Sequence, residues 1–343
     1  MIKKGLRLVA FGVVVLTLSF IGSPGMLVAE DVIELKFAHP YSPMHPQHVG
    51  VLVPWAKKIE EGTHGKVKIN FLPGGALGKP GQIFDMVQKG IADIGWDIAD
   101  YSPGKFPLTT VVELPFMLKT AEKGSVAVWK TYAKFPEFQK EYADVKLLLL
   151  SGHAPGFFAT TKKPIKSLDD LNGMKIKTAS SFTTDALQLF GAVPVVQPVT
   201  ETYTSLERGV VDGVVMPFDG IVVFKLHELL KYYTPADFYT VVFWAAINKD
   251  KFNALPDDVK AVIEANSGEV LSRAHGQSFD ESYAKMKAVC LQKGIQEVAF
   301  PQAEMDKLIT LTAPLKDKWV KDMEAKGLPG KAVLESATAF LNE

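Results

Sequence analysis

Apolar and polar residues alternate along the chain with two different periods, and together these periods predict an α/β protein. Residues 32–38 and 67–71 alternate at every second position, as a strand with one buried face does, and residues 92–96 form another short strand-like run. Residues 54–61 and 82–89 instead carry apolar side chains at helical spacing. Strands that alternate with helices in this way favour a largely parallel sheet.

The second half of the chain repeats this order of elements. Strands are predicted at residues 175–177 and within 209–216, and helices at 182–190 and from position 200 or 202 to 208. The chain therefore reads as two successive α/β units.

A short junction pattern occurs twice, about 120 residues apart, which is the size of one small domain. Residues 89–93 and 208–212 each consist of a basic residue, a glycine, two small or apolar residues and an aspartate. Any junction of a helix, a glycine and a strand can look like this. The similar elements around each copy favour the other interpretation, which is two related lobes.

Two open lobes of this kind would face each other across a cleft. The strand ends, and with them Trp96 and Met216, would lie at its mouth, where α/β proteins bind ligands. Residues 256–294 keep helical spacing, and a helix of up to ~38 residues would be about 57 Å long, enough to cross both lobes. Gly268 and Gly276 are the positions where this helix is expected to kink or break.

The first 29 residues are predicted to be a secretory signal peptide. Basic residues precede the apolar run 8–21, and cleavage is expected after Ala29. The apolar run has about 14 residues, fewer than the ~20 of a spanning helix, so a membrane anchor is the less favoured alternative. The protein is therefore expected in the periplasm, with Cys290 as a buried free thiol.

The composition excludes several classes of protein. The 343 residues include 38 Lys+Arg and 38 Asp+Glu, so no excess of positive charge favours a nucleic-acid partner. With 47% hydrophobic residues the chain can form a core, and its length fits about two domains. A single cysteine can form neither an internal disulfide nor a multi-thiolate metal site.

No convincing catalytic arrangement is found, which leaves an exported enzyme as the weaker alternative. The Gly-x-Ser-x-Gly motif of a nucleophile elbow is missing. Residues 74–80 resemble a phosphate-binding loop, but Pro73 takes the first glycine position and Pro80 replaces the Ser or Thr that would hold magnesium. Asp97 and Asp100 could act as general bases, although such acidic residues are more often caps or surface charges.

Three histidines, His39, His45 and His48, follow the first predicted strand. Clustered imidazoles can bind a transition metal, but no carboxylate or thiol lies near them in sequence. One of them, taken as His39, is instead predicted to hydrogen-bond a ligand in the cleft. Neither a metal nor a cofactor is predicted.

Taken in order, several segments resemble the extracytoplasmic substrate-binding proteins of TRAP (tripartite ATP-independent periplasmic) transporters, the DctP-type family. These segments are residues 35–38, 72–78, 88–95, 168–176 and 203–213. The resemblance implies a two-lobed periplasmic binding protein-like α/β fold, with a cleft between the lobes and a long C-terminal helix crossing both. The first lobe would hold residues 30–154 and 242–282, and the second lobe residues 155–241 and 283–343.

Proteins of this family are receptors and not enzymes. The resemblance implies that the chain captures a small organic acid, closes its lobes around it and delivers it to the membrane permease subunits of the transporter. A monomer is expected. A ligand-sensing protein that feeds a signalling partner would use the same fold, and it stays open as an alternative.

This chain departs from the usual pattern of the family at three places. Lys177 stands where the family typically carries an arginine that clamps the ligand carboxylate, and a lysine is a more flexible point charge. Met216 takes a position that is polar in many relatives, within the segment that ends at Asp219. Phe157 and Phe158 occupy a loop where some relatives use a second basic residue.

These departures imply an apolar pocket with one lysine. The predicted ligand contacts are Lys177, Trp96, Phe157, Phe158, Met216, Phe218, Asp219 and His39. Since apolar burial contributes roughly 25 cal/mol per Å², we predict a monocarboxylate with an apolar or aromatic body, a class that includes 2-oxo and 2-hydroxy acids. A dicarboxylate is the alternative, and any one of the aromatic residues can belong to the core instead.

Overall fold

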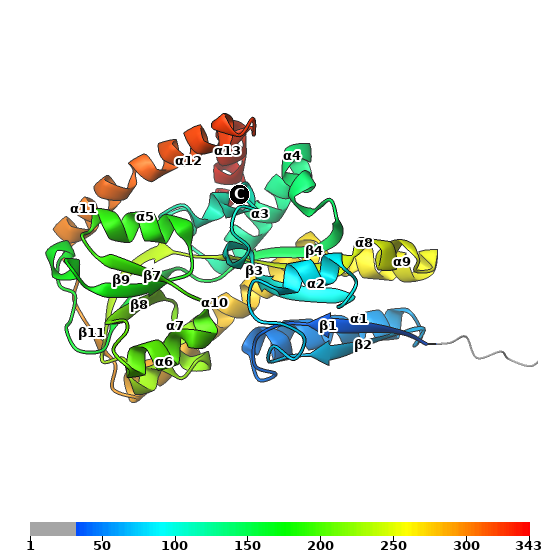
Figure 1. The fold of residues 1–343 in the computed structure, drawn as a ribbon, viewed down its shortest axis with the longest axis horizontal. Helices are drawn as coiled ribbons and strands as arrows, with labels where there is room; N and C mark the ends of the chain where they lie inside the picture. Colours follow the sequence, from blue (N-terminus) through cyan, green and yellow to red (C-terminus); the bar gives the residue numbers. More distant parts are fainter. Residues whose placement is uncertain (1–31) are drawn as a thin grey trace, which may run out of the picture. The chain divides into compact units, whose positions relative to one another are not determined.

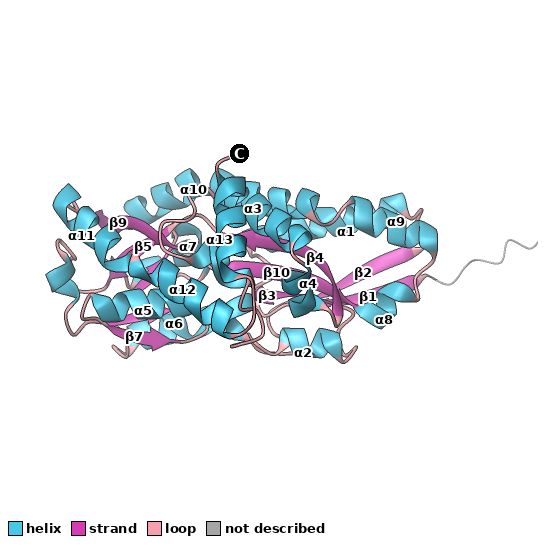
Figure 2. Cartoon of the chain, turned by 90° about the horizontal axis from the view of Figure 1, so that it is seen from above, coloured by secondary structure: helices cyan, strands magenta, loops and turns pink. Residues whose placement is uncertain are grey.

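Two mixed β-sheets and the helices packed on them make up residues 32–343, the part of the chain that the computed structural model describes (Figure 1). The predicted signal peptide, with its cleavage after Ala29, lies outside the described residues. Within 32–343, no helix is both long enough and apolar enough to span a membrane. Helices lie on both faces of the sheets (Figure 2).

The first sheet has the strand order β2-β1-β3-β10-β4 and, with the helices packed on it, forms the first lobe. Strands β2, β1 and β3 are parallel, whereas β10 pairs antiparallel with β3 and β4. The strand bounds are β1 Ile33–Ala38, β2 Val67–Leu72, β3 Ile94–Ile98, β4 Val145–Gly152 and β10 Val242–Asn248.

The second sheet has the order β11-β9-β5-β8-β6-β7 and forms the second lobe with its helices. Strands β7, β6 and β8 are parallel, whereas β5 runs antiparallel to β8 and β9. The strand bounds are β5 Gly156–Thr160, β6 Lys175–Thr178, β7 Val193–Val196, β8 Gly213–Met216, β9 Tyr232–Tyr239 and β11 Gln296–Glu297.

The prediction of a largely parallel sheet is wrong for the strands that connect the lobes. The chain passes from the first sheet to the second between β4 and β5, and it returns between β9 and β10. A parallel pair needs a long crossover connection within one sheet. Strands β5 and β10 instead enter their sheets from the other sheet, and they pair antiparallel with their neighbours. The two connections, residues 153–155 and 240–241, lie where the lobes meet.

Short helices follow the strands of both lobes. The first lobe carries α1 Val53–Gly62, α2 Ile83–Gln88, α3 Ala121–Lys134, α4 Pro136–Gln139, α8 Lys249–Asn253 and α9 Asp257–Ala265, and the second lobe carries α5 Ser181–Leu189, α6 Thr202–Glu207 and α7 Phe218–Val223. The helices predicted at 54–61, 82–89, 182–190 and 200–208 are confirmed, with ends shifted by one or two residues.

One long helix, α10 (Glu269–Gln292), passes from the first lobe to the second. It packs against α3 and β4 of the first lobe and against α7 of the second. The helix predicted over 256–294 is in fact two helices, because Gly268, with φ of 71°, separates α9 from α10. Gly276 does not break α10. A Cβ atom there would lie 2.6 Å from the carbonyl oxygen of Ala121, so this glycine lets α10 approach α3 closely.

The last three helices reach both lobes. They are α11 Gln302–Thr312, α12 Pro314–Ala325 and α13 Gly330–Leu341. Helices α11 and α12 contact α5, and Lys318 of α12 forms an ion pair of 3.1 Å with Asp185 of α5. Helix α13 packs against α3 of the first lobe, whereas the sequence prediction assigned residues 283–343 to the second. The apolar face of α13, with Val333 and Ala337 fully buried, explains the difference.

The repeated junction of a helix, a glycine and a strand makes the same contacts in both lobes. The glycine that follows the helix has φ of 68° in the first copy and 67° in the second. The carboxylate of Asp93 accepts a hydrogen bond of 2.7 Å from the N–H of Lys36 in β1. The carboxylate of Asp212 accepts one of 2.9 Å from the N–H of Lys175 in β6. Each aspartate thereby ties its strand to the parallel neighbour.

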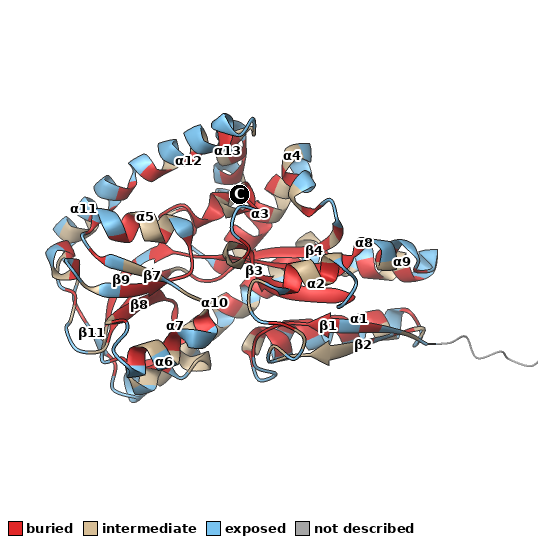
Figure 3. Cartoon of the chain, in the orientation of Figure 1, coloured by how far each residue is buried: buried red, intermediate tan, exposed pale blue. Residues whose placement is uncertain are grey.

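Buried side chains concentrate in the two sheets and on the helix faces that cover them (Figure 3). Cys290, near the end of α10, is a buried free cysteine, as predicted.

Candidate functional site

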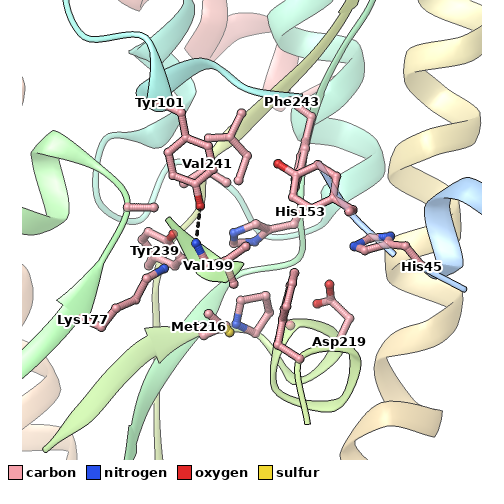
Figure 4. Close-up of a pocket in the computed structure, with 16 residues that line it drawn as sticks. His45, Tyr101, His153, Lys177, Val199, Met216, Asp219, Tyr239, Val241 and Phe243 are labelled. Atoms are coloured by element: carbon pink, nitrogen blue, oxygen red, sulfur yellow. Dashed lines mark hydrogen bonds between the residues drawn. The ribbon is translucent and has the colours of Figure 1, made fainter. Parts of the chain in front are cut away.

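A cavity of about 40 Å³ lies where the two lobes meet (Figure 4). Both lobes and both connections between the sheets contribute to its walls. The lining residues are Tyr41, His45, Ile98, Tyr101, His153, Lys177, Ala179, Val199, Met216, Pro217, Asp219, Gly220, Phe224, Tyr239, Val241 and Phe243. A ligand in this position contacts both lobes, so its binding stabilises the arrangement in which they meet.

Lys177 is the lysine of the cavity and lies in the middle of β6, between β7 and β8. Only 1% of its surface is exposed, and burial lowers its pKa from 10.5 to about 7. No acidic side chain within residues 32–343 pairs with it. Because an unpaired charge is costly to bury, a lysine placed in this way favours an anionic ligand that neutralises it.

Two tyrosines lie on the same side of the cavity as Lys177 (Figure 4). Burial raises the pKa of both Tyr101 and Tyr239, so both phenols keep their protons. The Tyr101 oxygen accepts a hydrogen bond of 2.9 Å from the N–H of Val199, which joins the two lobes. The O–H of Tyr101 therefore remains available to donate to a ligand oxygen.

Asp219 and His45 lie on the opposite side of the cavity from Lys177 (Figure 4). Asp219 is the second residue of α7, and its burial raises the pKa of the carboxyl group to about 7, opposed by hydrogen bonds from the N–H groups of Asp219 and Gly220. Burial and the neighbouring His48 lower the pKa of His45 to about 3. The cavity therefore holds a neutral imidazole and a carboxyl group that titrates near neutral pH.

His153 lies in the connection between β4 and β5, lines the cavity, and has a tautomer that its hydrogen-bond partner fixes. Its Nδ1 lies 2.6 Å from the carbonyl oxygen of Ala154, and since a carbonyl only accepts, Nδ1 carries the proton. Burial lowers the pKa of His153 to about 4, so the ring is neutral and Nε2 is unprotonated. At neutral pH, Nε2 of His153 can therefore accept a hydrogen bond but cannot donate one.

Of the predicted ligand contacts, Lys177, Met216 and Asp219 line the cavity. They lie in β6, at the end of β8 and at the start of α7, which are neighbouring elements of the second lobe. The three residues that the family pattern singled out therefore all come from the second lobe, with Asp219 across the cavity from Lys177. Their role as ligand contacts stays a prediction.

Phe157, Phe158 and Phe218 are fully buried and are core residues, not lining residues, of the second lobe. The ring centroids of Phe157 and Phe218 are 4.3 Å apart, and Phe158 packs on Phe238 at 5.0 Å. Strand β5 lies inside the sheet, so its successive side chains point to opposite faces that are both covered. The structure does not support the prediction that these aromatic rings form the pocket walls.

Trp96 and His39 lie one layer behind the cavity and do not line it. Trp96 is fully buried, with its ring 4.7 Å from that of Tyr41 and 5.5 Å from that of Phe243, both of which do line the cavity. His39 is hydrogen-bonded to His48 over 2.9 Å. Trp96 and His39 therefore support the wall from behind.

The other polar residues considered from the sequence have structural partners. The carboxylate of Asp97 accepts hydrogen bonds from the hydroxyl of Tyr41 (3.0 Å) and the N–H of Gly81 (2.7 Å). That of Asp100 accepts one of 3.3 Å from the N–H of Ser181. Within residues 32–343 there is no group of three His, Cys, Asp or Glu side chains placed to hold a metal ion.

Sequence reasoning missed several lining residues, among them Tyr101, His153, Tyr239 and Phe243. These lie next to strand ends or in the connections between the sheets. The available signal was positional, because ligands of open α/β sheets bind at such ends, but it does not say which of the adjacent side chains points inwards.

Residues 37–322 match the family model described as "Bacterial extracellular solute-binding protein, family 7", or DctP. The chain belongs to this family. It is therefore a TRAP solute-binding protein, and the two-lobed fold expected from the sequence is confirmed. Members of the DctP family are receptors and not enzymes. They bind small organic acids, work with membrane permease components, and are periplasmic.

Solved structures of TRAP solute-binding proteins match nearly the whole described chain. One from Rhodoferax ferrireducens T118, with copurified benzoate, is 30% identical with a TM-score of 0.87, covering 91% of this chain and 98% of that one. One from an unidentified marine microbe, with 3-hydroxybenzoate, is 32% identical with a TM-score of 0.87 and the same coverage. One from Bordetella bronchiseptica, with (R)- and (S)-mandelate, is 32% identical with a TM-score of 0.85, covering 90% and 99%.

Proposed function

We propose that this protein is the periplasmic receptor of a TRAP transporter for a monocarboxylate with an aromatic or apolar body. The observation that carries the proposal is Lys177, a buried lysine in a cavity whose walls are mainly apolar. It has no acidic partner among residues 32–343. The carboxylate of the ligand neutralises this lysine. The rest of the ligand packs among side chains such as Met216 and Phe243.

The ligands of the similar structures support this substrate class. Benzoate, 3-hydroxybenzoate and mandelate, bound by those three proteins, are all compact aromatic monocarboxylates.

Binding is linked to the approach of the two lobes. Lys177 belongs to the second lobe, whereas Tyr101 follows β3 of the first. A carboxylate that contacts both groups stabilises the closed arrangement by its differential affinity for that state. We propose that the closed receptor acts as a monomer and presents this form to the permease.

A dicarboxylate fits the cavity less well. Within the described part of the chain, Lys177 is the only lysine or arginine that lines the cavity, and the far side holds the carboxyl group of Asp219. A second ligand carboxylate would lie there without a cation and near a like charge, which is unfavourable in a buried site.

Thermal unfolding of the mature protein against a panel of acids tests the proposal. The panel contains benzoate, phenylacetate, mandelate, succinate and glucuronate. A ligand at one hundred times its Kd adds about 2.7 kcal/mol, which raises Tm by several degrees. The proposal predicts shifts with the aromatic monocarboxylates alone, and a shift confined to succinate or glucuronate contradicts it.

A further inference from the structure

The side of the cavity remote from Lys177 is formed by two polar groups from different lobes. His45 lies between β1 and α1 of the first lobe, and Asp219 begins α7 of the second. His45 is 5% exposed and Asp219 is 9% exposed, and both line the cavity. Figure 4 shows them together on this side, separated from Lys177 by the position of Met216.

The hydrogen-bond roles of these two groups follow from their own contacts. The N–H of Gln47 donates to Nδ1 of His45 over 3.2 Å, so Nδ1 carries a lone pair. In a neutral imidazole the proton then lies on Nε2, which is a donor. The carboxylate of Asp219 has acceptor positions beyond those used by the N–H groups at the start of its helix. A donor and an acceptor thus face the same region of the cavity.

We infer that this receptor recognises a hydroxyl group on its ligand, at the end that lies away from the carboxylate. The hydroxyl donates to the Asp219 carboxylate and accepts from Nε2–H of His45. The inference rests on the proposed function and narrows its substrate class to hydroxylated aromatic acids. Because His45 and Asp219 belong to different lobes, the hydroxyl also adds a second connection across the cleft.

Other substituents satisfy the pair less completely. An ammonium group donates to Asp219 but has no lone pair for Nε2–H of His45. A methyl group leaves both buried polar groups without a partner, which costs affinity. A hydroxyl group is both a donor and an acceptor, so it matches the pair.

Calorimetric titration at pH 7 with matched ligands tests the inference. Wild-type protein is titrated with phenylacetate and with its 3-hydroxy and 4-hydroxy derivatives. We expect the better hydroxy isomer to bind at least about tenfold more tightly than phenylacetate, because a site that hydrogen-bonds a hydroxyl discriminates against the analogue without it. Asp219→Leu should remove this preference while phenylacetate still binds. Asp169→Leu, which changes an exposed aspartate of the second lobe outside the cavity, should keep it.

The outcomes separate this inference from the proposed function. Equal affinity of the wild type for phenylacetate and both hydroxy isomers overturns the inference and leaves the aromatic-acid receptor standing. A preference that survives in folded Asp219→Leu also overturns it. If Asp219→Leu does not fold, the wild-type comparison decides. Failure of all three acids to bind overturns both proposals.

Discussion

The hydroxyl of Ser180 donates a hydrogen bond of 3.0 Å to the buried carboxyl group of Glu113. Ser180 immediately precedes α5 in the second lobe, and Glu113 lies in the first lobe, before α3. The other oxygen of Glu113 accepts a hydrogen bond of 2.8 Å from the N–H of Val242, where β10 begins. One carboxyl group thereby holds both lobes and one of the connections between them.

Ser180→Ala should weaken ligand binding. The substitution removes one donor from a buried oxygen of Glu113, which costs about 1 kcal/mol. Because the bond joins the two lobes, this cost arises only in the arrangement in which they meet. Because the ligand binds to that arrangement, its Kd should rise about fivefold by calorimetry. Ser181→Ala changes the adjacent, exposed side chain and serves as the control. An unchanged Kd in Ser180→Ala would show that this bond plays no part in closure.

Lys177→Met should stabilise the ligand-free protein and abolish binding. Burial lowers the pKa of Lys177 from 10.5 to about 7, so the folded state disfavours the charged form that the unfolded chain carries below pH 10.5. This penalty is fully present below pH 7 and vanishes above pH 10.5. At pH 7, calorimetry should show a Tm at least about 3 °C higher.

The matched control for that variant is Lys175→Met, on the same strand. Lys175 is exposed, so its removal should change stability by less than about 0.5 kcal/mol. A lower Tm in Lys177→Met than in the wild type would show that Lys177 has a stabilising partner in the free protein.

Affinity for an aromatic monocarboxylate should fall as the pH rises through 7. The pKa of Lys177 is about 7 in the free protein, and an anionic ligand binds its protonated form, so binding is strongest below pH 7. Asp219, with its pKa raised to about 7, adds a negative charge above this value and acts in the same direction. Between pH 6.5 and 8.5, Kd should rise about tenfold or more by titration.

Lys177→Arg provides the comparison for the pH profile. Arginine stays charged throughout this range, so only the contribution of Asp219 should remain and the dependence should become weaker. A wild-type Kd that does not change between pH 6.5 and 8.5 is incompatible with titration of either group.

Gly276→Ala should destabilise the protein. Its Cβ would lie 2.6 Å from the carbonyl oxygen of Ala121 and 2.7 Å from Oγ of Ser125, so α3 and α10 would have to separate. Overpacking of this kind costs about 1–3 kcal/mol, more than the ~1 kcal/mol by which alanine favours a helix. Urea unfolding should show a lower midpoint. Gly50→Ala, whose Cβ makes an ordinary contact of 3.7 Å with Ser278, should be neutral.

The elements that depend on local pattern were predictable. Periodicity placed helices α1, α2, α5 and α6 and strands β1, β2, β3, β6 and β8 to within a few residues. The long helix is interrupted at Gly268, one of the two positions where a break was expected. The directions of β5, β9 and β10 were not predictable, because they depend on where the chain crosses between sheets. The packing of α13 on the first lobe likewise depends on contacts with α3, more than 180 residues earlier in the chain.

The candidate site was predictable only in part. Lys177, Met216 and Asp219 were found because they follow sequence motifs of the family. The aromatic residues were harder to place, since Phe157 and Tyr239 have similar side chains but one points into a core and the other into the cavity. Composition cannot distinguish these cases, because the direction of each side chain depends on strand pairing and on what covers each face.

A crystal structure of the mature protein with an aromatic monocarboxylate, such as benzoate, tests the central claim most directly. We predict that the ligand carboxylate lies within hydrogen-bonding distance of Nζ of Lys177, with its ring among Met216, Tyr239 and Phe243. A carboxylate bound away from Lys177, or a ligand found outside this cavity, would contradict the account.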